Sequence, residues 1–356
     1  NLVAGVVERR QTLPILSNVL LSLESNRLSL TGTDLEVELV GRIDVQSEGA
    51  DGDITVPARK LVDICKSLPD GVDISFSVED GKVTLRAGRS RFTLSTLPAA
   101  EFPTVEAGDG EIDLDLAQPL VRQMIDRTGF AMAQQDVRYY LNGMYLEIKE
   151  GRLRFVATDG HRLALCTAPG QIAADDKSVI VPRKGILELS RLLDGNGSVT
   201  LSVGSNHIRA ATDQFTFTSK LVDGKFPEYE RVLPRSPDKS VSGDRLELRQ
   251  AFTRTAILSN EKYRGVRLSL TPGSLEITAN NPEQEQAEES VPVDYAGDAL
   301  EVGFNVSYLL DVMGVLTGAT VRMSLSDSAS SALIEEGEAG GDTDVEALYV
   351  VMPMRL

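Results

Sequence analysis

The strongest constraint on the fold is an internal repeat with a long period. Residues Leu30–Asp34 (LTGTD) match Phe155–Asp159 (FVATD) at a spacing of 125 residues (159 − 34 = 125). Pro57 and Pro182 repeat at the same spacing, and a weaker third copy, Ile277–Asn281 (ITANN), follows the second by 122 residues (281 − 159 = 122). This period exceeds that of solenoid repeats, so each copy is expected to be a domain with its own core.

The chain is long enough for three such domains. Its 356 residues exceed what one hydrophobic core normally organises. The repeat places the domains at residues 1–110, 111–238 and 239–356. The first copy lacks the opening strand and part of the first helix, and the chain starts at Asn1, so a short N-terminal segment is expected to be missing.

Each repeat shows the same order of helices and strands. In the second copy, apolar residues at helical spacing predict a helix over Leu116–Phe130, and alternating segments predict strands over Met144–Ile148 and Leu153–Ala157. A second helix, started by proline, is expected over Pro57–Leu68 and again over Pro182–Leu193. Two helices against a larger number of mostly antiparallel strands make each unit an α+β domain.

Composition indicates an acidic protein outside the membrane. The formal net charge is −17, and the sequence has neither an apolar run long enough to cross a bilayer nor a signal-peptide pattern. Cys65 and Cys166 match no metal or redox spacing and are expected to be reduced core thiols of a cytoplasmic protein. The acid excess alone argues against nucleic-acid binding, unless basic side chains gather on one surface.

A catalytic site is not predicted. His161 and His207 lie beside no nucleophile motif, no glycine-rich phosphate loop follows a strand, and no cysteine–histidine cluster has metal spacing. Neither a cofactor nor a metal is therefore expected. Asp34 and Asp159 recur at the same point of two repeats. We interpret them as turn residues that bind nearby backbone amides, with a paired-carboxylate hydrolase as the alternative.

Basic residues return to the predicted helices despite the acid excess. They lie on the second helix of the first two repeats and on the first helix of the last two. The set is Arg59, Lys60, Lys66, Arg183, Lys184, Arg191, Arg122, Arg127, Arg249 and Arg254. A solvated face would explain any single helix, whereas recurrence in register favours a shared, inward-facing surface that attracts phosphates.

The segment Gln134–Tyr140 (QQDVRYY) places paired aromatic residues beside Arg138. Such a set can stack on unpaired bases while the arginine contacts a phosphate. Alternatively, one tyrosine caps the hydrophobic core, and the sequence leaves both interpretations open.

Two segments far apart in the chain carry opposite charges. Over Gly88–Leu94, arginines occupy one face of a predicted strand and apolar side chains the other. Glu283, Glu285 and Glu289 alternate likewise on a strand expected over Glu283–Val291. Opposite charges favour head-to-tail pairing of two chains, which closes a ring where the rotation permits. The alternative is that the charges protect edge strands from aggregation.

The final segment, Tyr349–Leu356, stays apolar to its last residue. Part of it is expected to be the last strand of the third repeat. A methionine-rich end can also form an adaptable wall of a peptide-binding groove.

Four longer strings carry a family resemblance. They are Thr158–Leu163 (TDGHRL), Asn260–Gly265 (NEKYRG), Asn280–Gln284 (NNPEQ) and Met352–Leu356 (MPMRL). These strings closely resemble the bacterial DNA polymerase III beta subunits, the beta sliding clamps, of the gammaproteobacterial type. The resemblance extends from Arg9 to Leu356.

The resemblance implies a ring around duplex DNA. Family members are head-to-tail homodimers of three similar domains per chain, with helices lining the pore and antiparallel sheets outside. Such a ring is a processivity factor and not an enzyme, and it holds the replicative polymerase, the clamp loader and other clamp-binding proteins on DNA without reading its sequence. The residues implied to face DNA are Arg10, Arg59, Gln135, Arg138, Tyr139, Tyr140, Arg183 and Lys184.

The resemblance also implies two protein contacts. The residues of the implied dimer interface are Lys60, Arg89, Arg91, Phe92 and Leu94 on one subunit and Ile257, Leu258, Glu283, Glu285 and Glu289 on the other. A pocket between the second and third domains is implied to bind short peptides with a glutamine and two large apolar side chains. The residues of this pocket are Leu141, Thr158, Gly160, His161, Arg162, Leu163, Pro227, Arg231, Val232, Asn305, Tyr308, Ser331, Val350, Met352, Met354 and Leu356. The acidic stretch Glu335–Glu346 resembles a mobile loop.

Overall fold

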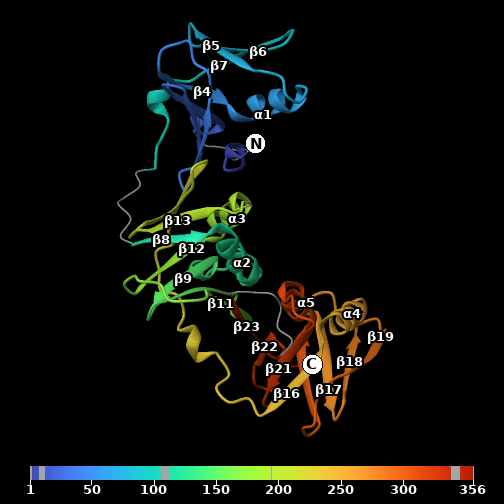
Figure 1. The fold of residues 1–356 in the computed structure, drawn as a ribbon. Helices are drawn as coiled ribbons and strands as arrows, with labels where there is room; N and C mark the ends of the chain where they lie inside the picture. Colours follow the sequence, from blue (N-terminus) through green and yellow to red (C-terminus); the bar gives the residue numbers. More distant parts are fainter. Residues whose placement is uncertain (1, 8–12, 106–111, 194, 338–344, 356) are drawn as a thin grey trace. The chain divides into compact units, whose positions relative to one another are not determined.

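The chain divides into two compact units. The computed structural model describes residues 2–7, 13–105, 112–193, 195–337 and 345–355. Unit 1 consists of Asn1–Pro119 and Leu187–Leu221, and unit 2 consists of Leu120–Ile186 and Val222–Leu356. Each unit contains one large and one small sheet, and every strand pair within them is antiparallel (Figure 1).

The large sheet of unit 1 has eight strands drawn from two repeats. Its strands, in spatial order, are β4 (Gly52–Pro57), β1 (Asn18–Glu24), β2 (Arg27–Thr33), β3 (Val37–Asp44), β15 (Phe215–Lys220), β14 (His207–Ala211), β13 (Ser198–Val203) and β8 (Ile112–Ala117). The first repeat meets the second where β3 pairs with β15, with Leu39 opposite Phe217. Both of these side chains are fully buried, so the sheet continues across the boundary between repeats.

The rest of unit 1 is a small sheet with short helices. The small sheet has the order β5 (Ser75–Glu79), β6 (Lys82–Ala87) and β7 (Ser90–Ser95). The helical elements are η1 (Val3–Gly5), η2 (Pro14–Ser17), α1 (Ala58–Ser67) and η3 (Ala99–Glu101). Pro57 stands at the N-cap of α1, as the proline-started helix predicted.

The large sheet of unit 2 repeats this construction. Its strands, in spatial order, are β12 (Lys177–Pro182), β9 (Gly143–Lys149), β10 (Arg152–Thr158), β11 (Arg162–Thr167), β23 (Glu346–Val351), β22 (Ala332–Glu336), β21 (Thr320–Leu325) and β16 (Lys239–Asp244). The second repeat meets the third where β11 pairs with β23, with Leu163 opposite Val350.

Unit 2 also holds a four-stranded sheet, ordered β19 (Gln286–Pro292), β18 (Ser274–Asn280), β17 (Gly265–Thr271) and β20 (Leu300–Asn305). The remaining helical elements of the chain are α2 (Gln118–Thr128), η4 (Gly129–Ala131), η5 (Tyr139–Leu141), α3 (Arg183–Leu192), η6 (Tyr229–Arg231), α4 (Arg245–Ala256) and α5 (Val306–Val315). Most of α3 belongs to unit 1. Side chains cap α4 and α5, because Asp244 accepts a bond from Glu247 N (2.8 Å) and Asn305 one from Ser307 N (2.9 Å).

Several sequence predictions are confirmed and some are wrong. The strands predicted over Met144–Ile148 and Leu153–Ala157 are β9 and β10. The helix predicted over Leu116–Phe130 begins only at Gln118, because Leu116 pairs with Val199 in the large sheet of unit 1. The sequence pattern also did not predict that one sheet would continue from each repeat into the next.

One of the two cysteines expected in the core is buried and the other is exposed. Cys166 is buried on β11, and burial raises the pKa of its thiol to about 12, as befits a core residue. Cys65 is exposed on α1, so its assignment to the core is wrong. It lies in the last turns of an amphipathic helix, on the side turned to solvent.

Candidate functional site

A turn in unit 2 organises the candidate site. Asp159 Oδ1 accepts hydrogen bonds from His161 N (2.9 Å) and Arg162 N (3.0 Å). Thr158 Oγ1 donates to Arg162 O (2.6 Å) and accepts from Gly160 N (3.1 Å). The carboxylate of Asp159 therefore binds backbone amides, which confirms the turn interpretation.

The backbone of this turn favours glycine. Gly160 has a φ of +88°, a conformation that side chains disfavour. A Cβ at this position would lie 2.8 Å from the guanidinium of Arg138. Arg138 in turn donates to the carbonyl oxygen of Asp159 (3.1 Å). The turn is therefore held by a side chain from a neighbouring segment as well as by its own hydrogen bonds.

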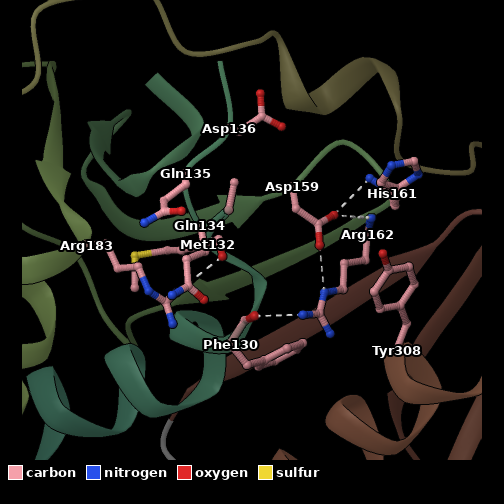
Figure 2. A pocket seen from close by; sticks show the side chains of 11 residues that line it. Phe130, Met132, Gln134, Gln135, Asp136, Asp159, His161, Arg162, Arg183 and Tyr308 are labelled. Atoms are coloured by element: carbon pink, nitrogen blue, oxygen red, sulfur yellow. Dashed lines mark hydrogen bonds and ion pairs between the residues drawn. The ribbon is translucent and has the colours of Figure 1, made fainter. Parts of the chain in front are cut away.

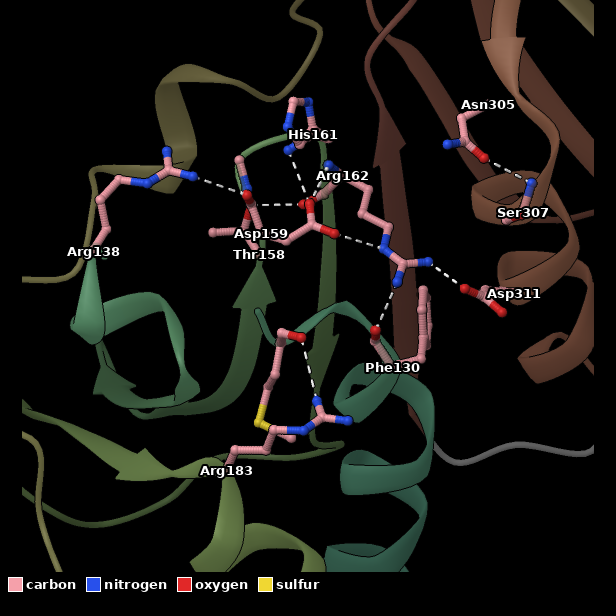
Figure 3. Close-up of polar contacts among 12 residues, drawn as sticks. Phe130, Arg138, Thr158, Asp159, His161, Arg162, Arg183, Asn305, Ser307 and Asp311 are labelled. Atoms are coloured by element: carbon pink, nitrogen blue, oxygen red, sulfur yellow. Dashed lines mark hydrogen bonds and ion pairs between the residues drawn. The ribbon is translucent and has the colours of Figure 1, made fainter. Parts of the chain in front are cut away.

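The guanidinium of Arg162 connects three segments of unit 2 (Figure 3). Its Nε donates to Asp159 Oδ2 (3.1 Å), one terminal nitrogen pairs with Asp311, and the other donates to Phe130 O (2.9 Å). The side chain of Arg162 is 12% exposed, so these bonds form largely away from water. Charge-assisted bonds of this kind fix the guanidinium in one orientation.

Aromatic rings surround the same arginine. The guanidinium carbon lies 4.5 Å from the ring centroid of Tyr308 and 5.1 Å from that of Phe130. These distances are within the range of cation–π attraction. The His161 ring stacks near Tyr308, with centroids 6.4 Å apart and planes 21° from parallel. Burial raises the pKa of the Tyr308 hydroxyl.

The end of the chain passes along this site. After β23, Met352 N donates to His161 O (2.9 Å), and Met354 N donates to Gly303 O (2.8 Å). These two bonds hold the segment after β23 against both the second and the third repeat. Met352 remains 38% exposed, so its side chain is available at the surface.

The structure gathers most of the predicted pocket residues in unit 2. Leu141, Leu163 and Val350 belong to one buried cluster with Phe226 and Tyr229. The turn residues, the N-terminus of α5 and the segment after β23 contribute the following residues: Thr158, Gly160, His161, Arg162, Asn305, Tyr308, Met352 and Met354. Pro227, Arg231 and Val232 lie around η6, and Ser331 directly precedes β22. Leu356 lies outside the described residues.

A cavity of about 480 Å³ lies beside this turn (Figure 2). Its lining includes His161, Arg162 and Tyr308 from the predicted pocket, together with Gln135 and Arg183 from the predicted DNA-facing set. The structure thus brings parts of two predicted sites to one cavity. Arg183 also donates to the backbone oxygen of Met132 (3.2 Å), which orients it at this wall.

Two residues of the site were missed by sequence reasoning. Phe130 is the last residue of the helix predicted over Leu116–Phe130, and its role depends on a backbone carbonyl that no side-chain pattern reveals. Asp311 follows Tyr308 by three residues on α5. This spacing places both side chains on one helix face, which was the signal that could have identified Asp311.

The other predicted DNA-facing residues lie on separate elements. Arg59 is on α1, Lys184 is on α3, and Arg138, Tyr139 and Tyr140 lie at or beside η5. Tyr139 is 57% exposed and meets Tyr140 edge to face, with centroids 5.8 Å apart. Arg10 lies outside the described residues.

The charge of Arg138 is partly balanced by its neighbour. Asp136 accepts from Arg138 Nε (3.0 Å) and from a terminal nitrogen (2.9 Å). The hydrogen bonds from Arg138 lower the pKa of Asp136 to about 2, so this carboxyl stays ionised at neutral pH.

One member of the expected basic surface is buried. Arg127 is only 4% exposed, pairs with Glu336 at 3.0 Å and donates to Thr317 Oγ1 at 2.9 Å. Its assignment to a phosphate-attracting surface is therefore wrong.

The loop predicted over Glu335–Glu346 is shorter than expected, because Glu335 and Glu336 belong to β22 and Glu346 begins β23. Its middle, residues 338–344, lies outside the described residues.

The predicted dimer residues lie on elements of both units. On β7, Arg91 is exposed, Phe92 is half-buried and Leu94 is buried, which confirms the alternation. Arg89 lies in the turn before this strand, and Lys60 is exposed on α1. Ile257, at the end of α4, is 74% exposed, and Leu258 follows it.

The strand predicted over Glu283–Val291 starts later than expected. β19 begins at Gln286, and Glu283 and Glu285 lie in the preceding turn. Asn281 closes this turn by accepting from Glu285 N through its side chain (2.9 Å). Glu289 is in β19 and forms two bonds with Arg254 of the same chain, at 2.6 and 2.9 Å.

The described parts of the chain contain neither a metal-binding cluster nor a membrane-spanning helix. Among these residues, no His, Cys, Asp or Glu side chains form a group of three or more that could hold a metal ion. No helix within the same ranges is both long and apolar enough to cross a membrane.

Comparison with known proteins identifies the family. The profiles for the N-terminal, central and C-terminal domains of the DNA polymerase III beta subunit match residues 1–106, 115–228 and 230–355. The chain is 66% identical to the beta sliding clamp of Pseudomonas aeruginosa over 357 aligned positions, covering 100% of this chain and 96% of that protein. It is 53% identical to the Escherichia coli beta sliding clamp, covering 99% and 96%.

A solved structure agrees along the whole chain. A crystal structure of the P. aeruginosa clamp bound to griselimycin superposes with a TM-score of 0.95 at 65% identity, covering 100% of this chain and 95% of that one. The three repeats, their antiparallel sheets and these matches lead to one conclusion: the chain belongs to the bacterial DNA polymerase III beta subunits, the beta sliding clamps, of the gammaproteobacterial type.

Proposed function

We propose that this chain confers processivity on the replicative DNA polymerase as one half of a closed, head-to-tail ring around duplex DNA. Membership of the clamp family supports the processivity role. The three clamp domains would span residues 1–110, 111–238 and 239–356. The ring catalyses no reaction and uses no cofactor in this proposal, and it works in the cytoplasm on DNA.

The observation that carries the ring is the arrangement of half-sheets. β3 pairs with β15 in unit 1, and β11 pairs with β23 in unit 2. β19 holds the place of β3 and β11 in the third repeat, because it follows the same turn, and β7 holds the place of β15 and β23 in the first. Among the described residues, β7 and β19 each pair with one strand only.

Pairing β7 of one chain with β19 of a second chain would complete the series. The small sheets of the two chains would then join as the half-sheets join within each unit. Two such contacts related by a twofold axis close a dimer and leave neither β7 nor β19 with an open side. Arg91 on β7, Glu283 beside β19 and the exposed Ile257 supply the charge and apolar area that this contact requires.

DNA contact in this proposal is weak and independent of sequence. The DNA-facing set combines arginine, lysine, glutamine and tyrosine side chains, which suit phosphates and base stacking more than base readout. The net charge of −17 then belongs mainly to the outer surface, where it repels stray DNA. A ring that cannot leave without opening needs no tight contact, and loose contact permits sliding.

The unit 2 site would dock partner proteins. The buried wall of Leu141, Leu163 and Val350 suits large apolar side chains, and the exposed His161 offers a polar partner to a glutamine amide. A related clamp binds griselimycin, which supports a ligand-binding pocket in this family. Partners of the polymerase and clamp-loader class held in this pocket would stay near DNA through a high effective concentration.

A retention experiment tests the ring. The protein is loaded on circular DNA by a clamp loader, washed at high salt, and the DNA is then linearised. Retention on the circle and loss after linearisation are expected, because only topology resists screening of the charges. Equal loss from circular and linear DNA would contradict the proposal.

A matched pair of variants tests the contact itself. Ile257→Asp should give a monomer in a mass measurement, because it places a charge in the proposed interface. Leu246→Asp is the control, since Leu246 is also an exposed apolar residue on α4, at 52%. The control variant should remain a dimer.

A further inference from the structure

We infer that Asp311, which belongs to none of the predicted sites, is a positioning residue that shapes the peptide pocket by holding the guanidinium of Arg162. The inference rests on the proposed peptide-binding function of unit 2. It goes further by naming a residue that acts through another residue and need not touch the peptide.

The three partners of Arg162 differ in where they come from. Asp159 and Phe130 O belong to the second repeat, like Arg162 itself. Asp311 is on α5 of the third repeat. Of these three partners, Asp311 is therefore the one whose bond ties the turn of the second repeat to the helix of the third.

Asp159 cannot take over this task. Its Oδ1 already accepts the backbone amides of His161 and Arg162, and its Oδ2 faces Arg162 Nε. All of these contacts lie within one turn, so they fix the shape of the turn but not its distance from α5. The side chain of Asp311 is 44% exposed, and its position depends on α5 and not on the backbone of the turn.

The held arginine sets the positions of the pocket groups around it (Figures 2 and 3). Its guanidinium lies 4.5 Å from the centroid of Tyr308, against which the His161 ring stacks. His161 O accepts the backbone bond of Met352, which places the methionine segment. Asp311 thus fixes the separation between Tyr308 on α5 and the turn to which Met352 is bonded.

The bond between Arg162 and Asp311 should affect the position of the pocket walls more than the free energy of unfolding. Partly exposed ion pairs contribute little to the free energy of unfolding. A shift of the pocket walls, however, reduces contacts with a bound side chain directly. Asp311→Asn is expected to weaken peptide binding about three- to tenfold, with little change in melting temperature.

Peptide titration tests the inference. The probe is a fluorescein-labelled peptide that carries a glutamine and two large apolar residues, and its affinity is measured by fluorescence polarisation for the full-length protein. Asp311→Asn should bind more weakly, and Asp311→Glu, which keeps the charge, should recover part of the loss. Asp238→Asn is the matched control, because Asp238 is an exposed carboxylate paired with Lys239 at 3.1 Å.

A double-mutant cycle tests whether Asp311 acts through Arg162. In an Arg162→Met background, Asp311→Asn should have no further effect on affinity. An effect of equal size in both backgrounds would contradict the inference, because Asp311 would then act by another route.

A spectroscopic measurement keeps the test independent of binding. The protein has 8 tyrosines, which can be replaced by 3-fluorotyrosine, and Tyr308→Phe identifies the Tyr308 signal in the ¹⁹F spectrum. Asp311→Asn should shift that signal, and Asp238→Asn should leave it in place. An unshifted signal together with unchanged affinity would overturn the inference. If the wild type itself bound no peptide, the proposed pocket would be wrong and the inference would fall with it.

Discussion

The junctions β3–β15 in unit 1 and β11–β23 in unit 2 share one backbone design. Asp34 Oδ1 accepts from Glu36 N (2.9 Å) and Val37 N (2.7 Å), as Asp159 does with His161 and Arg162. Beyond the turn, Lys220 N donates to Glu36 O (2.8 Å), where Met352 N donates to His161 O (2.9 Å) in unit 2.

The side chains at the two junctions differ. Val37, which is 1% exposed, stands in place of Arg162 (162 − 37 = 125). Gly5 stands in place of Phe130 (130 − 5 = 125), and Glu188 in place of Asp311 (311 − 188 = 123). Glu188 pairs instead with Arg191 of its own helix, at 2.8 Å.

At both junctions the turn positions the paired strands, whereas the side chains around the turn determine whether a pocket forms beside it. Backbone bonds of the Thr-Asp turn suffice to join two half-sheets in either unit. The arginine, its aromatic neighbours and its acidic partner are present at one junction only among those described. In the proposed function, this difference predicts a peptide pocket at the unit 2 junction and none at the unit 1 junction.

The largest expected effect comes from deleting residues 352–356. Unit 2 would then lack the segment that distinguishes its junction, and peptide affinity should fall by about thirtyfold or more, as for removal of a hot spot. Fluorescence polarisation measures the loss, and a mass measurement should still show a dimer. Peptide binding that survived the deletion would mean that the two junctions differ less than we propose.

A large effect on stability is expected from Glu336→Gln in unit 2. The change leaves the buried Arg127 without its charged partner and should lower the free energy of unfolding by about 2–4 kcal/mol. Chemical denaturation measures this change. Arg322→Met breaks the exposed pair with Glu335 on the same strand pair and is the control, with an expected effect below about 1 kcal/mol.

Moderate effects on two different properties are expected at the equivalent positions Val37 and Arg162: Val37 affects stability, and Arg162 affects peptide affinity. Val37→Ala should lower the free energy of unfolding by about 1–3 kcal/mol, because it leaves a cavity in a buried position, and peptide affinity should not change. Arg162→Ala should weaken peptide binding. If Val37→Ala also weakened peptide binding, the division of labour between the junctions would be contradicted.

The smallest expected effect is a difference in pH response between Glu38 in unit 1 and Glu336 in unit 2. Burial raises the pKa of Glu38 above 4.5, despite a bond from Val105 N. Burial also works to raise the pKa of Glu336, but bonds from Thr317, Arg127 and Gly318 outweigh it and lower the pKa below 4.5.

The signs follow from proton linkage. The stabilising contribution of Glu336 is present above pH 4.5 and is lost as the pH falls through its lowered pKa. Glu38 destabilises the fold above its raised pKa, and this penalty disappears as the pH falls towards 4.5. Glu38→Gln should therefore raise stability at neutral pH, and the gain should shrink as the pH falls towards 4.5, as measured by denaturation at several pH values. A decrease in stability would contradict this assignment.

Local features of the fold could be predicted from the sequence. The Thr-Asp turns close on their own backbone amides, and the helices after Pro57 and Pro182 start where proline favours a first turn. Most residues of the candidate pocket could be named because the family resemblance supplied them, and the structure places the described ones in unit 2.

Features that depend on distant partners could not be predicted. Arg127 looked like a surface cation because its partner Glu336 lies 209 residues away in the chain. The pairing of β11 with β23 likewise depends on strands from different repeats, and alternation of side chains does not identify a neighbouring strand. Asp311 escaped notice because its role exists only once Arg162 is placed beside it.

The position of β23 has a consequence for synthesis of the chain. β11 ends at Thr167, but the strand that covers its edge is Glu346–Val351. During translation, the amides and carbonyls on that side of β11 stay open while the whole third repeat is being made. An open edge invites pairing with other nascent chains, so chaperone dependence should concentrate in this interval.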